Sequence, residues 1–198
     1  GRPGGVRRRG SDNRDEFENL GVNFTTRGKR MDETLGALQA LWTQDVPAFS
    51  GEFYQFDGLK FSPKPLQKPY PPLLIGGSSA AARRRVARFG DGWHTLRLSP
   101  SQFAEGRRDI IQRTEAEGRD PARLHFSITL PIEFTGAPPS AAIQDRTALT
   151  GTDMDIADTV RAYEAAGADE IVLGVSTADL ALNKEAMVGF MERVWSKI

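Results

Sequence analysis

A strand–helix–strand unit between residues 72 and 94 constrains the fold of this 198-residue chain more than any other stretch. A short apolar run at residues 73–75 is followed by Gly76-Gly77-Ser78-Ser79 and then by a helix-forming segment. Asp91 and Gly92 introduce a second apolar run. Two strands that are connected by a helix lie side by side in the sheet and run in the same direction, so this unit predicts a parallel sheet.

The turn at residues 76–79, termed the glycine–serine turn, has the chemistry of an anion site. The first N–H groups of a helix lack intrahelical partners and lie at the positive end of the helix dipole. Gly76 and Gly77 would let the backbone approach an anion, and Ser78 or Ser79 can cap the helix or bind a phosphate oxygen. The alternative is a tight turn with a capping serine and no ligand, and the turn alone does not decide between the two.

Composition narrows the function. The chain has 26 basic and 26 acidic residues and no cysteine, so it predicts no nucleic-acid partner, disulfide or thiolate metal site. No apolar run approaches the ~18 residues of a membrane helix. The two histidines, His94 and His125, are not at metal-ligand spacing with neighbouring carboxylates, so no metal is expected. We expect a cytoplasmic protein whose chemistry belongs to a bound cofactor.

Periodicity predicts an irregular first third followed by regular strand–helix units. A helix is expected from about residue 26, with Met31, Leu35 and Leu38 on its apolar stripe. Residues 49–61 predict a β-hairpin broken at Asp57-Gly58, and five prolines within residues 62–72 predict an extended connection. Strands are then expected at 73–76, 91–97, 124–134 and 170–175, and helices at 79–89, 100–117, 153–166 and 178–196.

Four strand–helix units give an α/β fold but do not close a barrel. An eight-stranded (β/α) barrel takes ~250 residues, so the chain is either a small open sheet or the second half of a barrel. Residues 1–16 contain five arginines, four glycines and a single aliphatic side chain. They predict a disordered tail, more readily a solvated segment than a nucleic-acid arm, with the folded domain at residues 17–198.

Several stretches, taken together and in order, resemble the luciferase-like monooxygenase superfamily, and most closely its branch that uses coenzyme F420, a deazaflavin. The stretches are residues 27–33, Leu41-Trp42-Thr43, Gly51-Glu52-Phe53-Tyr54, the prolines and Gln67 of residues 63–69, residues 71–79, and Phe89-Gly90-Asp91-Gly92-Trp93. The resemblance runs from about Asp15 to the C-terminus.

The resemblance implies a (β/α)8 TIM barrel, of which this chain would supply about four C-terminal βα units with a hairpin and proline-rich insertion. It also implies a flavin or deazaflavin across the carboxyl ends of the strands. The activity implied is hydride transfer between coenzyme F420 and an organic substrate, with a monooxygenase that uses reduced FMN as the alternative. On the matching positions, Gly76, Gly77 and Ser78 would line the cofactor's phosphate and ring edge, with Ser79 at the start of the helix.

Two further residues are candidates for the cofactor site. Trp93 ends a strand and could wall the cofactor pocket, although packing in the core is the more ordinary role of a tryptophan. His94 is the only histidine placed to meet a ligand, with a polar loop position as its alternative. Asp91 is expected to anchor a loop through its carboxylate.

No catalytic residue can be assigned by the resemblance, because the family's proton-handling side chains lie on early strands that match nothing here. We expect an N-terminally truncated chain whose first residues are unrelated sequence. Three functions stay open: a cofactor-dependent oxidoreductase, a non-catalytic remnant that binds a phosphate-bearing ligand, and a half-barrel that folds only against a partner chain. A folded form is expected to be a homodimer, because open sheet edges and an uncovered face favour association.

Overall fold

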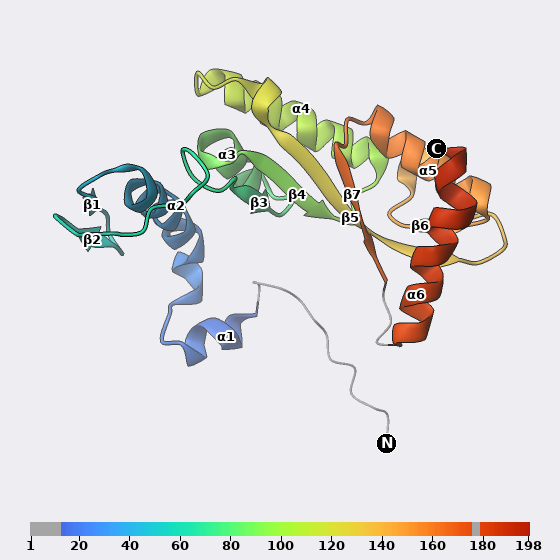
Figure 1. Ribbon diagram of the computed structural model, residues 1–198, viewed down its shortest axis with the longest axis horizontal. Coiled ribbons are helices and arrows are strands. Elements are labelled where there is room, and N and C mark those ends of the chain that lie inside the picture. Colours follow the sequence, from blue (N-terminus) through green and yellow to red (C-terminus); the bar gives the residue numbers. More distant parts are fainter. Residues whose placement is uncertain (1–12, 176–178) are drawn as a thin grey trace. The chain divides into compact units, whose positions relative to one another are not determined.

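The computed structural model describes residues 13–175 and 179–198 (Figure 1). The chain divides into two compact units, Gly1–Pro71 and Pro72–Ile198, which we describe separately. Most of the expected N-terminal tail, residues 1–12, and residue 178, where the last helix was expected to begin, lie outside the described residues. Among the residues described, no helix is both long enough and apolar enough to span a membrane.

The first unit contains two helices and a small antiparallel hairpin. Their bounds are Arg14–Asn19 for α1, Arg27–Thr43 for α2, Phe49–Ser50 for β1 and Gln55–Phe56 for β2. Helix α1 crosses the boundary expected between residues 16 and 17. Of the stripe expected on α2, Leu35 is buried, whereas Met31 is 48% exposed. The proline-rich residues 62–72 form neither helix nor strand, as their sequence predicts.

The hairpin lies where it was expected, but its reversal does not. The chain turns at residues 51–54, and Asp57-Gly58 follow the second strand. The Glu33 carboxylate on α2 accepts the backbone N–H groups of Glu52, Phe53 and Tyr54 at 2.9, 2.8 and 3.2 Å. Burial alone would raise the pKa of Glu33, but these N–H groups outweigh it and lower the pKa. A carboxylate distant in sequence therefore fixes the reversal.

The second unit is a five-stranded parallel sheet with helices between its strands. The bounds are Leu74–Gly76 (β3), Ala80–Phe89 (α3), Gly92–Leu96 (β4), Pro100–Ala116 (α4), His125–Phe134 (β5), Leu149–Gly151 (β6), Asp153–Ala165 (α5), Glu170–Gly174 (β7) and Leu180–Gly189 (α6). Strand β4 lies between β3 and β5, and β5 pairs with both β6 and β7. The four expected strands are confirmed, and β6 was not foreseen.

Local signals placed the helix starts well, and the last helix less well. Capping boxes are present at Ser99 with Gln102 and at Thr152 with Asp155, at the starts of α4 and α5. After α6 the chain continues as a π-helical turn, Phe190–Val194, and a 3-10 helical turn, Trp195–Lys197. Leu180, Met191 and Trp195 are large apolar residues of this last segment. They are exposed, because only one side of the segment, at Phe190 and Val194, meets the rest of the unit.

Side chains of the sheet alternate between two faces. The covered face carries Ile75, Trp93, Phe126, Ile128 and Leu130, all buried. Helices α3, α4 and α5 lie on this side of the sheet (Figure 1). The opposite face, termed the open face, carries His94, Ser127 and Thr129. Its apolar members remain exposed: Leu74 at 47%, Leu96 at 62% and Val172 at 39%.

Candidate functional site

The glycine–serine turn joins β3 to α3 at the carboxyl edge of the parallel sheet. Gly77 has φ of +106°, a conformation that other residues rarely adopt. The Ser79 hydroxyl caps α3 by accepting the Ala82 N–H at 3.2 Å. A Cβ added to Gly76 would meet nothing within 4 Å, and residues 76–80 are all exposed. The turn therefore leaves open space beside the first N–H groups of the helix.

Within the part of the chain that the structure describes, the N-terminus of α3 has no carboxylate beside it, whereas those of α5 and α6 do. Gln102 of α4, Asp155 of α5 and Asp179 beside α6 each bring a side chain of this chain to the helix start. The first turn of α3 contains no acidic residue, and Ser79 is its one capping side chain. The positive end of its dipole therefore keeps its attraction for an external anion.

Trp93 supports this turn from the covered face of the sheet. Its indole Nε1–H donates to the Gly77 carbonyl oxygen at 2.7 Å, and its ring stacks on Phe103 with centroids 5.3 Å apart. The side chain is fully buried, and a Cβ at Gly106 would lie 2.5 Å from the ring. Trp93 lies on the covered face and packs in the core, the more ordinary of the two roles expected for it, and its contact with a cofactor remains a prediction. It also positions the glycine–serine turn.

His94 lies on the open face beside the turn. It pairs with Gly76 in the β3–β4 register, and its carbonyl accepts the Gly77 N–H at 3.1 Å. Its Nδ1 lies 2.9 Å from the Ser127 hydroxyl and its Nε2 lies 3.1 Å from the Thr129 hydroxyl. His94 is therefore a strand residue in a polar cluster, next to the turn. Contact between His94 and a cofactor remains a prediction.

Asp91 and Arg83 have structural partners. The Asp91 carboxylate accepts the Leu73 N–H at 3.0 Å, which confirms the expected anchoring role. Arg83, in the basic run at the start of α3, places Nε 2.6 Å from the Asp109 carboxylate of α4, and its Nη1 donates to the Ser78 carbonyl at 3.1 Å. A hydrogen bond from Arg113, and then one from Arg83, lowers the pKa of Asp109. Arg83 thus braces the turn and joins the two helices.

Sequence reasoning missed the two hydroxyls of the polar cluster. Ser127 and Thr129 alternate with buried apolar residues along β5, so they share the open face with His94. That alternation is visible in the sequence and could have identified them. It also missed Arg97, directly after β4, which has φ of +51° and is the one non-glycine residue with positive φ in the described part of the chain.

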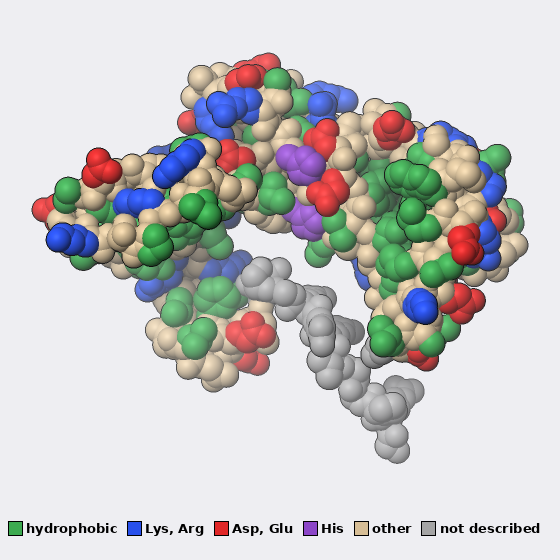
Figure 2. Space-filling model, in the orientation of Figure 1, with side chains coloured by type: hydrophobic (Ala, Val, Ile, Leu, Met, Phe, Trp, Pro, Cys, Tyr) green, Lys and Arg blue, Asp and Glu red, His purple; other side chains and the backbone are tan. Residues whose placement is uncertain are grey.

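His125 lies farther from the carboxyl edge. Its Nε2 is 3.0 Å from the Glu170 carboxylate across β5 and β7. Figure 2 shows the histidine side chains beside acidic ones on this face of the molecule. Within residues 13–175 and 179–198, no three histidine, cysteine, aspartate or glutamate side chains are arranged to hold a metal ion.

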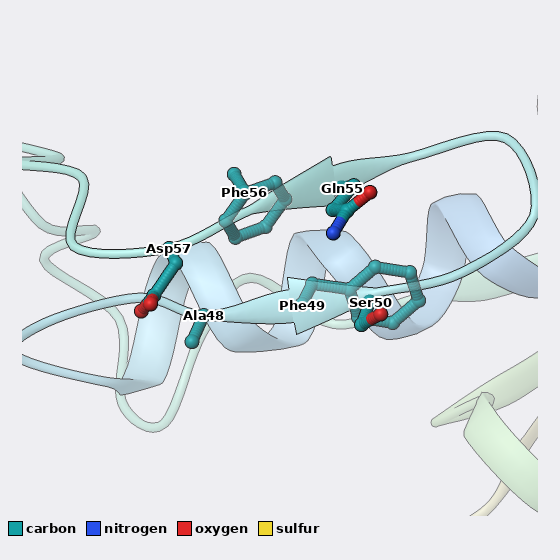
Figure 3. Close-up of a pocket in the computed structure, with 6 residues that line it drawn as sticks. All are labelled: Ala48, Phe49, Ser50, Gln55, Phe56 and Asp57. Carbon is teal, nitrogen blue, oxygen red and sulfur yellow. The ribbon is translucent and has the colours of Figure 1, made fainter.

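A separate shallow pocket lies on the hairpin of the first unit (Figure 3). Its volume is about 550 Å³, and its lining residues are Ala48, Phe49, Ser50, Gln55, Phe56 and Asp57. The lining contains a carboxylate and no cation, so it does not suit a phosphate. The glycine–serine turn is the better candidate for an anionic ligand.

Fold and site together define an α/β protein of the kind that binds ligands at the carboxyl edge of a parallel sheet. Residues 9–135 match the luciferase-like monooxygenase family, and the chain belongs to this family. The superfamily resemblance read from the sequence is therefore confirmed.

The named relatives and solved structures differ in how far they support a cofactor. An FMNH2-dependent dimethylsulfone monooxygenase of Pseudomonas putida is 40% identical over 106 residues, covering 52% of this chain and 29% of the relative. Monooxygenase RslO1 from Streptomyces bottropensis has a TM-score of 0.74 at 19% identity, covering 92% of this chain and 65% of that one. An F420-dependent secondary alcohol dehydrogenase has a TM-score of 0.69 at 14% identity, covering 86% and 62%.

At these identities the two solved structures establish the fold alone: a parallel α/β sheet that matches luciferase-like barrels. The chain spans less than a third of the curated relative's length and less than two thirds of each solved chain.

Proposed function

We propose that this chain is the phosphate-binding part of a flavin-dependent monooxygenase that uses reduced FMN. The observation that carries the proposal is the glycine–serine turn, with open space at Gly76 beside the N-terminus of α3. A phosphate there would accept N–H groups of the first helical turn and meet no acidic side chain of that turn. The residues present therefore fit the phosphate end of a flavin mononucleotide.

The choice of cofactor rests on the relatives. Sequence resemblance alone favoured coenzyme F420, with reduced FMN as the alternative. A named relative at 40% identity is FMNH2-dependent, and that identity carries more weight than a shared fold at 14%. Reduced FMN would supply the electrons with which oxygen is activated.

Each residue of the site has a separate task in this proposal. Gly76 and Gly77 admit the phosphate, and Trp93 holds the Gly77 carbonyl so that the turn keeps its shape. Leu96 and Val172, exposed on the open face, offer an apolar surface to a flat ring. A small organic substrate, a homodimeric assembly and a cytoplasmic location remain predictions.

Titration of the purified chain with FMN and with F420, followed by cofactor fluorescence, tests the proposal. We expect FMN to bind more tightly than F420. Tighter binding of F420 would restore the deazaflavin reading, and no binding of either would overturn a cofactor role for this chain.

The Trp93→Phe variant tests the turn itself. Loss of the indole N–H frees the Gly77 carbonyl, so FMN affinity should fall by roughly fivefold or more, the equivalent of one hydrogen bond. The control is Ile156→Ala, which removes a fully buried side chain from α5. It should lower stability while leaving the FMN dissociation constant of the folded chain unchanged. Equal loss of affinity in both variants would contradict the assignment.

A further inference from the structure

The imidazole of His94 has both of its nitrogens engaged by hydroxyl groups of one strand. Nδ1 meets Ser127 at 2.9 Å and Nε2 meets Thr129 at 3.1 Å. His94 is half-buried, Ser127 is buried with 1% exposure, and Thr129 is partly exposed. Since both ring nitrogens are engaged, His94 exchanges a proton with a ligand through one of these hydroxyls.

The Trp93 carbonyl favours one tautomer of the neutral ring, because it offers the Ser127 hydroxyl an acceptor other than His94. The Ser127 hydroxyl donates to the Trp93 carbonyl oxygen at 3.4 Å, so it accepts from His94 at its lone pairs. In that tautomer Nδ1 carries the hydrogen. Nε2 is then the acceptor, and Thr129 donates its hydroxyl hydrogen to it.

Thr129 lies on the side of the cluster that faces the site. It pairs with Leu96 in the β4–β5 register, whereas Ser127 pairs with His94, so Thr129 is two residues nearer the carboxyl edge. That edge also carries the glycine–serine turn, because Gly76 is in register with His94. The hydrogen-bonded series Ser127, His94 and Thr129 thus runs from a buried serine to the carboxyl edge of the sheet.

Few charged groups share this part of the open face. Strand β3 places Gly76 beside His94, and β5 contributes the two hydroxyls. Strand β5 also places His125 one pleat earlier and Glu133 two pleats beyond Thr129 on this face. Strand β7 contributes Glu170, in register with Ser127, whose carboxylate pairs with His125. The hydroxyl of Thr129 is thus the polar group that links His94 to an acceptor at the carboxyl edge.

We propose that His94 and Thr129 form a proton relay whose outlet is the Thr129 hydroxyl, an inference that rests on the proposed function. In the step, the Thr129 O–H bond breaks and its proton passes to an anionic oxygen or nitrogen of the bound ligand. The Thr129 oxygen takes the Nε2 proton of a cationic His94. His94 ends neutral, with its remaining hydrogen on Nδ1 and bonded to Ser127, so charge and protons balance.

Nitrogen-15 NMR of the full chain tests the relay without any catalytic turnover. The sequence has two histidines, so a His125→Gln variant assigns both sets of signals. Without ligand, neutral His94 should carry its hydrogen on Nδ1. With saturating FMN, the pH midpoint of His94 protonation should rise by roughly half a pH unit or more, because an anionic ligand that accepts from Thr129 favours the cation.

Two variants separate the relay from a long-range effect of ligand charge. Thr129→Ser keeps the hydroxyl and should show the same rise, whereas Thr129→Val, of similar shape, should show none. An equal rise in Thr129→Val, no rise in the FMN-saturated wild type, or neutral His94 with its hydrogen on Nε2 would each overturn the relay while leaving the proposed function standing. Absence of FMN binding by fluorescence would overturn the proposed function, and the relay with it.

Discussion

Arg97 holds a conformation that its own chemistry disfavours. Two hydrogen bonds hold its φ at +51°. The Arg97 N–H donates to the Thr129 carbonyl at 3.2 Å, and the Tyr163 hydroxyl donates to the carbonyl of the next residue, Leu98, at 2.5 Å. Tyr163 is fully buried, and this burial raises its pKa, so its hydroxyl stays protonated as a donor. The strain lies directly after β4, at the carboxyl edge where the site is proposed.

Substitution of Arg97 should therefore separate backbone strain from side-chain size. Arg97→Gly should raise the free energy of unfolding by about 0.5 kcal/mol, since relief of ~1–2 kcal/mol of left-handed strain exceeds the entropy cost of glycine. Arg97→Val should lower it by ~1 kcal/mol or more, because a β-branched residue fits this conformation worst. Urea denaturation measures both. Equal stability of the two variants would show that no strain is stored at this position.

The candidate site was partly foreseeable at the scale of single residues. The glycine–serine turn follows from local chemistry, and the structure places it at a helix N-terminus. Trp93 and His94 were treated alike in the sequence, although neighbours on a strand point to opposite faces. Applied to β4, that rule would have separated the buried Trp93 from His94 on the open face.

At the scale of elements, the sequence predictions were accurate where an element depends on residues close together in the sequence, and failed where it depends on distant ones. Helix starts depend on side chains three residues apart, and α4 and α5 begin where expected, each with a capping box, at Ser99 and Thr152. The hairpin reversal depends on Glu33, about twenty residues earlier, and the three-residue β6 depends on the far end of β5. Neither contact leaves a local pattern, so both were missed.

Asp109 of α4 joins α3 to α4 through hydrogen bonds from two arginines. Asp109 accepts from Arg113 at 2.8 Å and from Arg83 at 2.6 Å, and these bonds lower its pKa in the folded chain. A carboxylate with a lowered folded pKa stabilises the fold above its unfolded pKa of about 3.9, and that stability is lost as the pH falls through the folded value.

Asp109→Asn should therefore lower the free energy of unfolding at pH 7 by about 1 kcal/mol. It should also flatten the decline in stability below about pH 4 that the wild type shows. Urea denaturation across pH 2–7 measures both effects. Glu115→Gln, an exposed change on the same helix, is the control and should show the same decline in stability below about pH 4 as the wild type. A decline in stability below about pH 4 that is as steep in Asp109→Asn as in the wild type would show that this ion pair does not stabilise the fold.

At the scale of the whole molecule, the chain combines a covered and an open sheet face. The open face carries the polar cluster and the exposed Leu74, Leu96 and Val172, and its carboxyl edge carries the glycine–serine turn. Family membership and fold establish a luciferase-like sheet. The central claim is narrower: the turn binds the phosphate of a flavin.

The affinities of the chain for FMN and for riboflavin, which lacks the phosphate, test this claim most directly. If the turn binds the phosphate, FMN should bind at least roughly tenfold more tightly, the equivalent of 1.4 kcal/mol, and inorganic phosphate should weaken FMN binding but not riboflavin binding. Equal affinity for the two flavins, with no competition by phosphate, would contradict it.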